Sequence, residues 1–284
     1  MFKVAILGCE NSHANGFLDV IRDEKLDVQV MGVYSEYEGA AEALRDTYGV
    51  PVMENYDDFV GQLDGVIINA RHGGDHYRFA KPYLNDGIPI YIDKPITVSE
   101  EDARDFYRDI VTRGIPVCGG STLKHATVVK ELKAMVKSGE KGEPLGGYCR
   151  APINLKNPYG DFYFYSQHLV QIITEIFGCY PKAVRTCQNG NQITIVVRYD
   201  NFDVTGLYSD ISGVYYANAS FKESVEGGTI TEFGETKAEF MEYYALLKGE
   251  PQHQSCDDLF APVFILNAID RSLQSGKEEP VARM

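Results

Sequence analysis

Short apolar runs alternate with helical patterns over the first 119 residues. Runs at 3–7 and 28–34 are each followed by apolar side chains spaced three or four residues apart, which is the spacing of an amphipathic helix. Further apolar runs at 64–70, 88–93 and 115–119 continue the alternation. This α/β pattern predicts a doubly wound parallel sheet with helices on both faces.

The pattern changes after residue 119. The later helical patterns and apolar runs lie at 124–136, 163–177, 193–199, 202–209, 214–221, 236–247 and 257–274. Three successive apolar runs separated by short turns favour an antiparallel meander. We therefore expect a second α/β domain over residues 120–284, with a largely antiparallel sheet. Alternate apolar and aromatic positions, among them Tyr208, Tyr216 and Phe221, predict one open face on this sheet that no helix covers.

The composition is that of an ordinary globular protein, with 44% hydrophobic and 24% charged residues. A formal net charge of −14 repels nucleic acid and anionic membranes, so neither is expected as a partner. The six cysteines include no CxxC pair and no zinc-site spacing, so we predict reduced thiols and no metal site. The chain has neither a signal-peptide pattern nor an apolar run of membrane-spanning length, which predicts a cytoplasmic protein.

The first apolar run ends in a turn that reads Gly8-Cys-Glu-Asn-Ser-His13. A dinucleotide-binding turn has three glycines in the pattern GxGxxG, which allow tight turning, close approach of a pyrophosphate and packing of the helix on the sheet. Only Gly8 fits, because Glu10 and His13 occupy the other two positions. The helix that follows still offers amides and a partial positive charge to an anion, with Asn11 or Ser12 as its cap. The carboxylate of Glu10 opposes such an anion, and an ordinary strand-to-helix turn remains an alternative.

The second apolar run ends with Tyr34-Ser35-Glu36. Dinucleotide-binding folds carry an acidic residue here for the adenosine ribose, or a small residue with a nearby arginine for a 2′-phosphate. Ser35 occupies the position and no arginine follows immediately. The sequence therefore leaves NAD and NADP open as alternatives.

A third segment, Tyr91-Ile-Asp-Lys-Pro-Ile96, stands at the end of a predicted strand. It resembles the Glu-Lys-Pro motif of the Gfo/Idh/MocA family, named after glucose-fructose oxidoreductase, inositol dehydrogenase and MocA, with Asp93 in place of the glutamate. Further similar segments lie at 41–51, 123–125, 268–276 and 280–281. The resemblance covers the whole chain, and it implies an N-terminal Rossmann domain, an oxidoreductase activity and NAD or NADP as cofactor.

The resemblance assigns roles to domains and residues. It implies a dinucleotide-binding Rossmann domain over 1–119 and a substrate-binding and oligomerisation domain over 120–284. The residues expected to bind the cofactor are Gly8, Asn11, Ser12, His13, Ser35, Asn69, Arg71, His76, Asp93 and Lys94. The Lys94–Pro95 peptide bond is expected to be cis. Relatives dimerise through the open face of the second sheet, so a homodimer or homotetramer is expected.

The family also has a catalytic histidine in the pattern DxGxHxxD on a helix of the second domain. The matching stretch reads Phe164-Tyr-Ser-Gln-His168-Leu-Val-Gln171, so the histidine is kept and both acids are replaced. Oxidation of a carbinol needs a group that removes the hydroxyl proton, a role that fits His168, with Tyr165 as a substitute proton donor. A cationic Lys94 stabilises negative charge that develops on the reacting oxygen. The residues expected to bind the substrate are Lys94, Lys124, Tyr165 and His168.

These observations support more than one function. The first hypothesis is an NAD(P)-dependent oxidoreductase that acts on the CH–OH group of a carbohydrate-like small molecule, such as a sugar, inositol or related polyol. The second is a degenerate, non-catalytic family member that acts as a binding or regulatory protein, because the glycine pattern is broken and both acids are absent. In that case His168 is a core histidine. The third is a lyase or hydrolase that uses a tightly held cofactor.

Overall fold

The computed structural model describes residues 1–210 and 212–284. This part of the chain divides into two compact units. The first unit comprises Met1–Gly120 and Thr236–Leu259, and the second comprises Ser121–Glu235 and Phe260–Met284. The division differs from the two continuous ranges expected from the sequence, because the chain returns to the first unit after residue 235.

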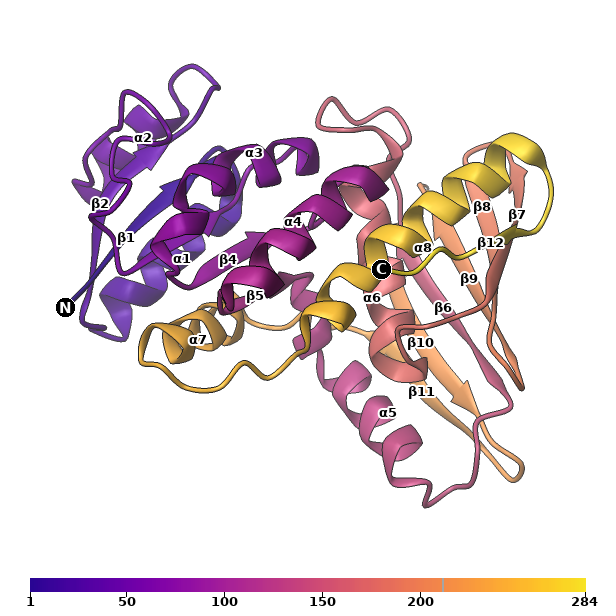
Figure 1. Cartoon of the computed structure of the whole chain (residues 1–284). Helices are drawn as coiled ribbons and strands as arrows, with labels where there is room; N and C mark the ends of the chain where they lie inside the picture. The colour runs from indigo at the N-terminus through magenta and orange to yellow at the C-terminus, as the bar shows by residue number, and fades with distance from the viewer. Residues whose placement is uncertain (211) are drawn as a thin grey trace. The chain divides into compact units, whose positions relative to one another are not determined.

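The first unit is built on a five-stranded parallel sheet, which confirms the predicted doubly wound fold. The strands lie in the order β2-β1-β3-β4-β5, and Figure 1 labels β1, β2, β4 and β5 of this sheet. Their bounds are Phe2–Leu7 for β1, Val28–Tyr34 for β2, Gly65–Ile68 for β3, Ile90–Asp93 for β4 and Val117–Gly120 for β5. Every residue of β3, β4 and β5 is buried, as expected for strands covered by helices on both faces. The strand order reverses between β1 and β3, and ligands bind at the carboxyl edge of such a sheet at this point.

Helices and 3-10 turns complete the first unit. Their bounds are Ser12–Asp23 for α1, Ala40–Tyr48 for α2, His76–Ala80 for α3, Glu100–Arg113 for α4 and Thr236–Leu247 for α7, with 3-10 turns η1 at Gly73–Asp75 and η2 at Lys81–Asp86. The Ser99 hydroxyl accepts a hydrogen bond from the amide of Asp102 at 3.0 Å. This contact caps α4, because the hydroxyl satisfies one of the amides that the first helical turn leaves without a partner.

Helix α7 packs against α1 although more than 200 residues separate them in the sequence. The ring centroids of Phe17 and Phe240 lie 5.3 Å apart in the same buried cluster. Gly16 permits this contact, because a Cβ at its position would lie 2.7 Å from the Thr236 side chain. The absence of a side chain at Gly16 therefore leaves the space in which α7 packs against α1.

The second unit contains a seven-stranded sheet in the order β11-β10-β6-β9-β8-β7-β12. The bounds are Gly146–Pro152 for β6, Ala183–Asn189 for β7, Gln192–Arg198 for β8, Asp203–Ser209 for β9, Tyr215–Ser220 for β10, Val225–Ile230 for β11 and Glu279–Pro280 for β12. Strands β6 and β9 run parallel, and the other described pairs of this sheet run antiparallel. The sheet is thus largely antiparallel, as predicted.

The predicted meander is wrong in its last step, because β6 lies between β9 and β10. Two glycines allow β6 to occupy this place. A Cβ on Gly146 would lie 2.5 Å from the carbonyl oxygen of Asp203 in β9, and one on Gly147 would lie 2.3 Å from that of Asn218 in β10. Close approach of both neighbouring backbones therefore selects glycine at the start of β6.

Helices cover one face of this sheet. They are α5 at Thr127–Ser138, α6 at Phe162–Phe177 and the part of α8, Cys256–Ser275, that belongs to this unit, with a 3-10 turn η3 at Thr122–His125. Tyr208 and Phe221 lie in the core between sheet and helices, so their assignment to the open face is wrong. On the other face Thr194 and Arg198 are exposed and Tyr216 is half-buried.

Candidate functional site

The turn after β1 lies at the carboxyl edge of the parallel sheet. Gly8 has a φ of 79°, and a Cβ at its position would lie 2.3 Å from the backbone nitrogen of Ala70, which follows β3. Both the backbone conformation and this close approach require glycine. The amides of Gly8 and Cys9 donate to the Tyr34 carbonyl oxygen at 2.8 and 2.9 Å, which fixes the turn against the end of β2.

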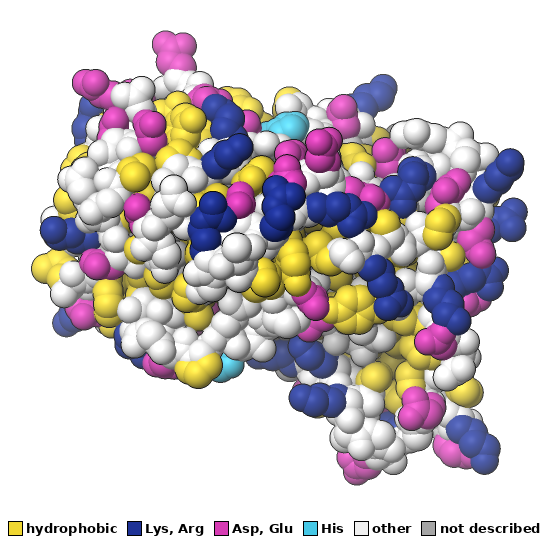
Figure 2. Space-filling view, in the orientation of Figure 1, with side chains coloured by type: hydrophobic (Ala, Val, Ile, Leu, Met, Phe, Trp, Pro, Cys, Tyr) yellow, Lys and Arg dark blue, Asp and Glu magenta, His cyan; other side chains and the backbone are white. Residues whose placement is uncertain are grey.

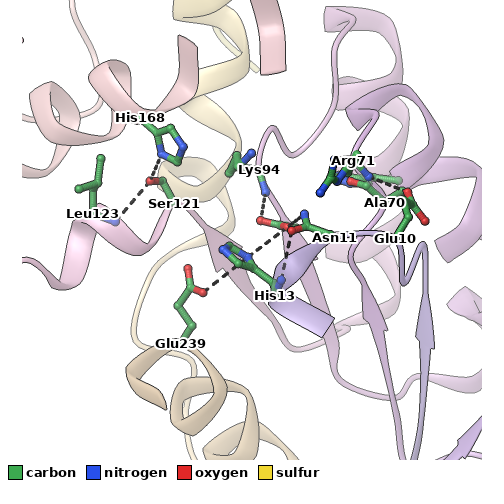
Figure 3. A network of polar contacts seen from close by, with 12 residues as sticks. Glu10, Asn11, His13, Ala70, Arg71, Lys94, Ser121, Leu123, His168 and Glu239 are labelled. Carbon is green, nitrogen blue, oxygen red and sulfur yellow. Dashed lines mark hydrogen bonds and ion pairs between the residues drawn. The ribbon is translucent and has the colours of Figure 1, made fainter. Parts of the chain in front are cut away.

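Asn11 caps α1 and ties it to β4. Its Oδ1 accepts a hydrogen bond from the amide of His13 at 3.1 Å, and its Nδ2 donates to Oδ2 of Asp93 at 2.6 Å (Figure 3). Asp93 is fully buried, and its Oδ1 accepts a hydrogen bond from the Lys94 amide at 2.7 Å. One of the two predicted caps, Asn11, is therefore confirmed, and the Asp93 carboxylate holds the start of α1 at the end of β4.

A buried ion pair reinforces this contact. The His13 Nδ1 lies 3.2 Å from Oδ2 of Asp93 and 3.9 Å from Oε2 of Glu239, a buried residue of α7. The negative charge of Asp93 raises the pKa of His13 to about 9, against the opposing effect of burial. Burial acts to raise the pKa of Asp93, but the charge and hydrogen bonding of His13 outweigh it and keep that pKa below its ordinary value. The position that carries a third glycine in GxGxxG thus holds an imidazolium.

Lys94 follows β4 at the carboxyl edge of the sheet and is only 6% exposed. The Lys94–Pro95 bond is cis, as predicted from the resemblance. Burial lowers the pKa of the Lys94 ammonium; the charge of Asp93 opposes this effect and that of Arg71 adds to it. A buried lysine with a lowered pKa gives up its proton more readily than a surface lysine does.

Glu10, at the second glycine position, points toward the ends of two strands. Its Oε2 accepts a hydrogen bond from the Ser35 hydroxyl at 2.8 Å, and its Oε1 accepts one from the Arg71 amide at 2.9 Å. The Ser35 hydroxyl in turn accepts a hydrogen bond from the Tyr37 amide at 3.0 Å. The carboxylate therefore bridges the end of β2 and the segment after β3.

Two buried polar residues follow β3. Asn69 is fully buried, and neither atom of its side-chain amide has a hydrogen-bond partner among the described residues. His76 is also fully buried, and its Nε2 lies 2.7 Å from the Ala70 carbonyl oxygen, to which it donates. Burial lowers the pKa of His76, so its ring is neutral and supports the segment that lies against Gly8. Asn69 offers unused hydrogen-bonding groups, whereas His76 acts as a structural support.

In the second unit, His168 lies on α6 and is 9% exposed. Its Nδ1 lies 2.7 Å from the hydroxyl oxygen of Ser121, which also accepts a hydrogen bond from the Leu123 amide at 3.3 Å (Figure 3). The hydroxyl hydrogen can therefore be donated to Nδ1, which leaves the ring hydrogen on Nε2. Ser121 thus orients the imidazole although both acids of the family pattern are replaced.

Gln171, which replaces one of those acids, continues the same network. Its Oε1 accepts a hydrogen bond from the Ser121 amide at 3.3 Å, and its Nε2 donates to Glu175 at 2.9 Å. Tyr165 lies beside His168, with ring centroids 5.8 Å apart. Lys124 is half-buried in η3, three residues after Ser121. The second unit therefore groups His168 with Tyr165 through α6, and Ser121 links them to the turn that carries Lys124.

Most of the expected cofactor residues meet at one edge of the first sheet. Asn11, His13, Asp93 and Lys94 form one network, and Ser35 and the amide of Arg71 meet at Glu10. Ser12 is exposed at the first position of α1.

The structure adds three side chains that the sequence did not predict as partners in the site: Glu239, Ser121 and the bridging carboxylate of Glu10. Ser121 had a signal, since a serine after two glycines and before a helical turn is a typical N-cap. No sequence pattern connects Glu239 with His13.

The described residues, 1–210 and 212–284, contain no group of three or more His, Cys, Asp or Glu that could hold a metal ion. Across the same residues, no helix has both the length and the apolar character that a membrane span requires. On the face drawn in Figure 2, basic and acidic side chains are interspersed.

The network at the edge of the first sheet fits a dinucleotide. Gly8 lets the chain turn closely beside the end of β3, the start of α1 presents amides and a partial positive charge, and His13 adds an imidazolium there. The unused amide of Asn69 lies at the end of the adjacent strand. A buried polar group without a partner costs free energy, which a bound ligand recovers by forming the missing hydrogen bonds.

Comparison with known proteins agrees with this geometry. Residues 2–118 match the GFO_IDH_MocA family model, described as an oxidoreductase family with an NAD-binding Rossmann fold. No curated protein matches the chain.

Solved structures match it over nearly its whole length. A myo-inositol dehydrogenase from Lactobacillus casei, in complex with NAD(H) and myo-inositol, is 14% identical with a TM-score of 0.86, and the match covers 100% of this chain and 98% of that chain. GenD2 from gentamicin A biosynthesis, in complex with NAD, is 16% identical with a TM-score of 0.84, covering 99% and 96%. A myo-inositol 2-dehydrogenase from Lactobacillus plantarum is 13% identical with a TM-score of 0.83, covering 99% of each chain. At these identities the similarity shows the fold.

Proposed function

Because residues 2–118 match the family model of oxidoreductases with an NAD-binding Rossmann fold, we propose that this protein is a Gfo/Idh/MocA-type dehydrogenase or reductase of a carbohydrate-like small molecule. The expected substrate is an inositol, a sugar or a related polyol, interconverted between carbinol and carbonyl. The observation that carries the proposal is Lys94, a buried ammonium with a lowered pKa at the carboxyl edge of the sheet, next to the dinucleotide turn. The bound myo-inositol of the Lactobacillus casei enzyme supports the substrate class.

The first unit holds the cofactor in this proposal. The turn at Gly8 and the start of α1 bind the pyrophosphate, and Asn69 supplies hydrogen bonds from the end of β3. The nicotinamide, when bound, supplies the acceptor or donor of hydride. The network of Asp93 with Asn11 and His13 keeps the turn in place and so prepares the binding surface before the ligand arrives.

Lys94 binds the oxygen that changes between hydroxyl and carbonyl. Its ammonium donates a hydrogen bond to that oxygen and stabilises the negative charge that develops on it. Burial strengthens this interaction, because a charge removed from water acts on its neighbours with less screening. The amide of the same residue is fixed by Asp93, which limits how far the side chain can move.

His168 moves the proton of the reacting oxygen in this proposal. Ser121 serves both protonation states of the ring, since its hydroxyl can donate to Nδ1 or accept from Nδ1–H. A carboxylate in the place of Ser121 could only accept a hydrogen bond from the ring nitrogen, and it would also stabilise the imidazolium. Replacement of that acid therefore leaves a histidine that is oriented by a neutral partner, and Tyr165 provides a second proton donor beside it.

The test is hydride transfer with NAD and NADP across a panel of inositols, sugars and polyols, followed by the absorbance of reduced nicotinamide. We expect turnover with at least one polyol, and losses of about 10²–10⁴ in kcat for His168→Ala, the usual range for general acid–base groups. Lys94→Ala should also lower kcat. The exposed His253 and Lys130 supply matched controls, His253→Ala and Lys130→Ala, which should keep wild-type rates.

A non-catalytic binding protein is the second candidate, favoured by the replacement of both family acids and by the neutral partner of His168. Tight binding of a polyol with no turnover in either direction would support it. Turnover that survives His168→Ala would instead assign proton transfer to another residue.

The cytoplasmic location and the homodimer or homotetramer belong to this proposal as well. The face of the second sheet opposite its helices carries half-buried aromatic side chains, with Tyr148 and Tyr216 at 5.8 Å between ring centroids. Such a face is typical of a surface that pairs with a second copy. Light scattering at micromolar concentration tests the assembly, and a monomer would contradict it.

A further inference from the structure

The Glu10 side chain points in a direction that the GxGxxG pattern does not predict. In GxGxxG this position is a glycine that the pyrophosphate approaches closely. Here the side chain turns away along the sheet edge, and its two oxygens accept hydrogen bonds from the Ser35 hydroxyl and the Arg71 amide. The two contacts, at 2.8 and 2.9 Å, fix the carboxylate above the ends of β2 and β3.

This fixed carboxylate still has unused acceptor capacity. A carboxylate offers about four lone-pair positions, and these two hydrogen bonds occupy two of them. Glu10 and Ser35 are both partly exposed, so the remaining positions are open to a ligand. The Ser35 hydroxyl is itself held by the Tyr37 amide, which keeps the arrangement rigid.

The end of β2 is where a dinucleotide-binding fold places the acid that binds the adenosine ribose. In this chain Ser35 follows β2 at that position, and its hydroxyl donates a hydrogen bond to the Glu10 carboxylate. We propose that Glu10, delivered from the glycine turn, binds the ribose hydroxyls and selects NAD(H) over NADP(H). The proposal rests on the proposed function, because it requires that the chain binds a dinucleotide.

The charges around this point favour the same selection. A 2′-phosphate would lie beside the Glu10 carboxylate, and two negative groups at such a distance repel each other. The arginine near the loop after β2 is Arg78, whose guanidinium donates two hydrogen bonds to Glu36 and one to Asp75, all at 2.8 Å. The charge of the other arginine nearby, Arg71, acts on Lys94. Arg78 is thus already neutralised by carboxylates, whereas recognition of a 2′-phosphate needs a cation that is available to it.

Calorimetric titration of the full chain with NAD⁺ and NADP⁺ tests the proposal without any substrate. We expect the wild type to bind NAD⁺ more tightly, and Glu10→Gln to lower the preference for NAD⁺ by about 10- to 100-fold, since a hydrogen bond to a charged group contributes about 1.5–3 kcal/mol. Ser35→Ala keeps the charge and removes only one contact, so it should lower the preference by less. Glu42→Gln, which neutralises an exposed carboxylate in α2, is the matched control and should leave both affinities unchanged.

The possible outcomes separate this inference from the function on which it rests. If the wild type binds both dinucleotides equally, or if Glu10→Gln keeps the original preference, the role of Glu10 is wrong and the proposed function stands. If the wild type binds neither but Glu10→Gly binds either one, Glu10 blocks the site and the inference is overturned. If no variant binds a dinucleotide while circular dichroism shows each to be folded, the proposed function fails together with the inference.

Discussion

The two units position their key side chains in opposite ways. In the first, the residues around Lys94 are held by charges: a buried Asp93 carboxylate lies between an imidazolium and the Lys94 amide. In the second, His168 is held by a neutral serine hydroxyl, and the amide of that serine donates to the side chain of Gln171. Deleting one member of a buried ion pair leaves an uncompensated charge, whereas deleting one neutral partner leaves an unpaired polar group, which costs less free energy. The predictions below test that difference.

The largest effect is expected for Asp93→Ala. Loss of this carboxylate leaves the buried charge of His13 without its nearest partner and removes the tie to Asn11. Breaking a buried ion pair by deleting one member costs about 3–5 kcal/mol. Chemical denaturation should show this loss in the free energy of unfolding. A loss no larger than that of Ser121→Ala would contradict the comparison.

The second effect is a dependence of stability on pH. His13 has a pKa of about 9 in the folded protein, above its ordinary value of 6.5. Below pH 6.5 both folded and unfolded chains carry the proton, and the contribution of His13 is complete. Between pH 6.5 and 9 only the folded chain holds it, so stability falls as pH rises, by up to about 3 kcal/mol in total.

Denaturation of wild type and His13→Gln at a series of pH values measures this contribution as the difference between them. The variant should lack the decline between pH 6.5 and 9. Parallel curves for the two proteins would show that His13 does not cause the decline in stability between pH 6.5 and 9.

A smaller effect is expected for Ser121→Ala in the neutral network. The variant loses the partner of the His168 Nδ1 and the N-cap of η3, each a neutral contact worth about 1 kcal/mol. The pH profile of kcat should also shift, because the ring is no longer oriented. Ser138→Ala, at an exposed serine that ends α5, controls for the loss of a hydroxyl. An unchanged pH profile of kcat would show that Ser121 only caps η3 and does not affect proton transfer by His168.

The smallest effect is expected for Tyr165→Phe. The aromatic contact with His168 survives this change, so the free energy of unfolding should stay within about 0.5 kcal/mol of the wild type. Because Ser121 already orients the ring, kcat should fall by less than tenfold. A larger fall would show that the Tyr165 hydroxyl supplies an essential proton.

The sequence predicts local structure well in this chain and distant contacts poorly. Alternating apolar runs locate all five strands of the first sheet, because the strands are largely buried and flanked by turn residues. The place of β6 between β9 and β10 escapes prediction, since it depends on backbone contacts that Gly146 and Gly147 permit with strands far along the chain.

The candidate site divides along the same line. Gly8, Lys94 and Asn11 are recognisable from short segments, and the structure places them at one sheet edge. The partners of Glu10 and His13 lie 25 to more than 200 residues away, at Ser35 and Glu239. Such pairings depend on the fold and not on the spacing of residues in the sequence. The glycine pattern identifies Glu10 only as a charge that opposes an anion, and it does not predict the hydrogen bonds from Ser35 and Arg71.

The return of α7 to the first unit has a consequence for biosynthesis. When residues 1–120 have left the ribosome, Glu239 and Phe240 have not yet been made. The nascent first unit therefore lacks the side chains that α7 adds to its core and one of the carboxylates near His13. Residues 121–235 must be synthesised before α7 can pack against α1, and forming a contact across so long a loop is a slow step. Until then Phe17 stays uncovered on the side where Phe240 packs, a surface that chaperones and proteases recognise. Maturation of the first unit therefore waits until α7, which ends at Leu247 in a chain of 284 residues, has been made.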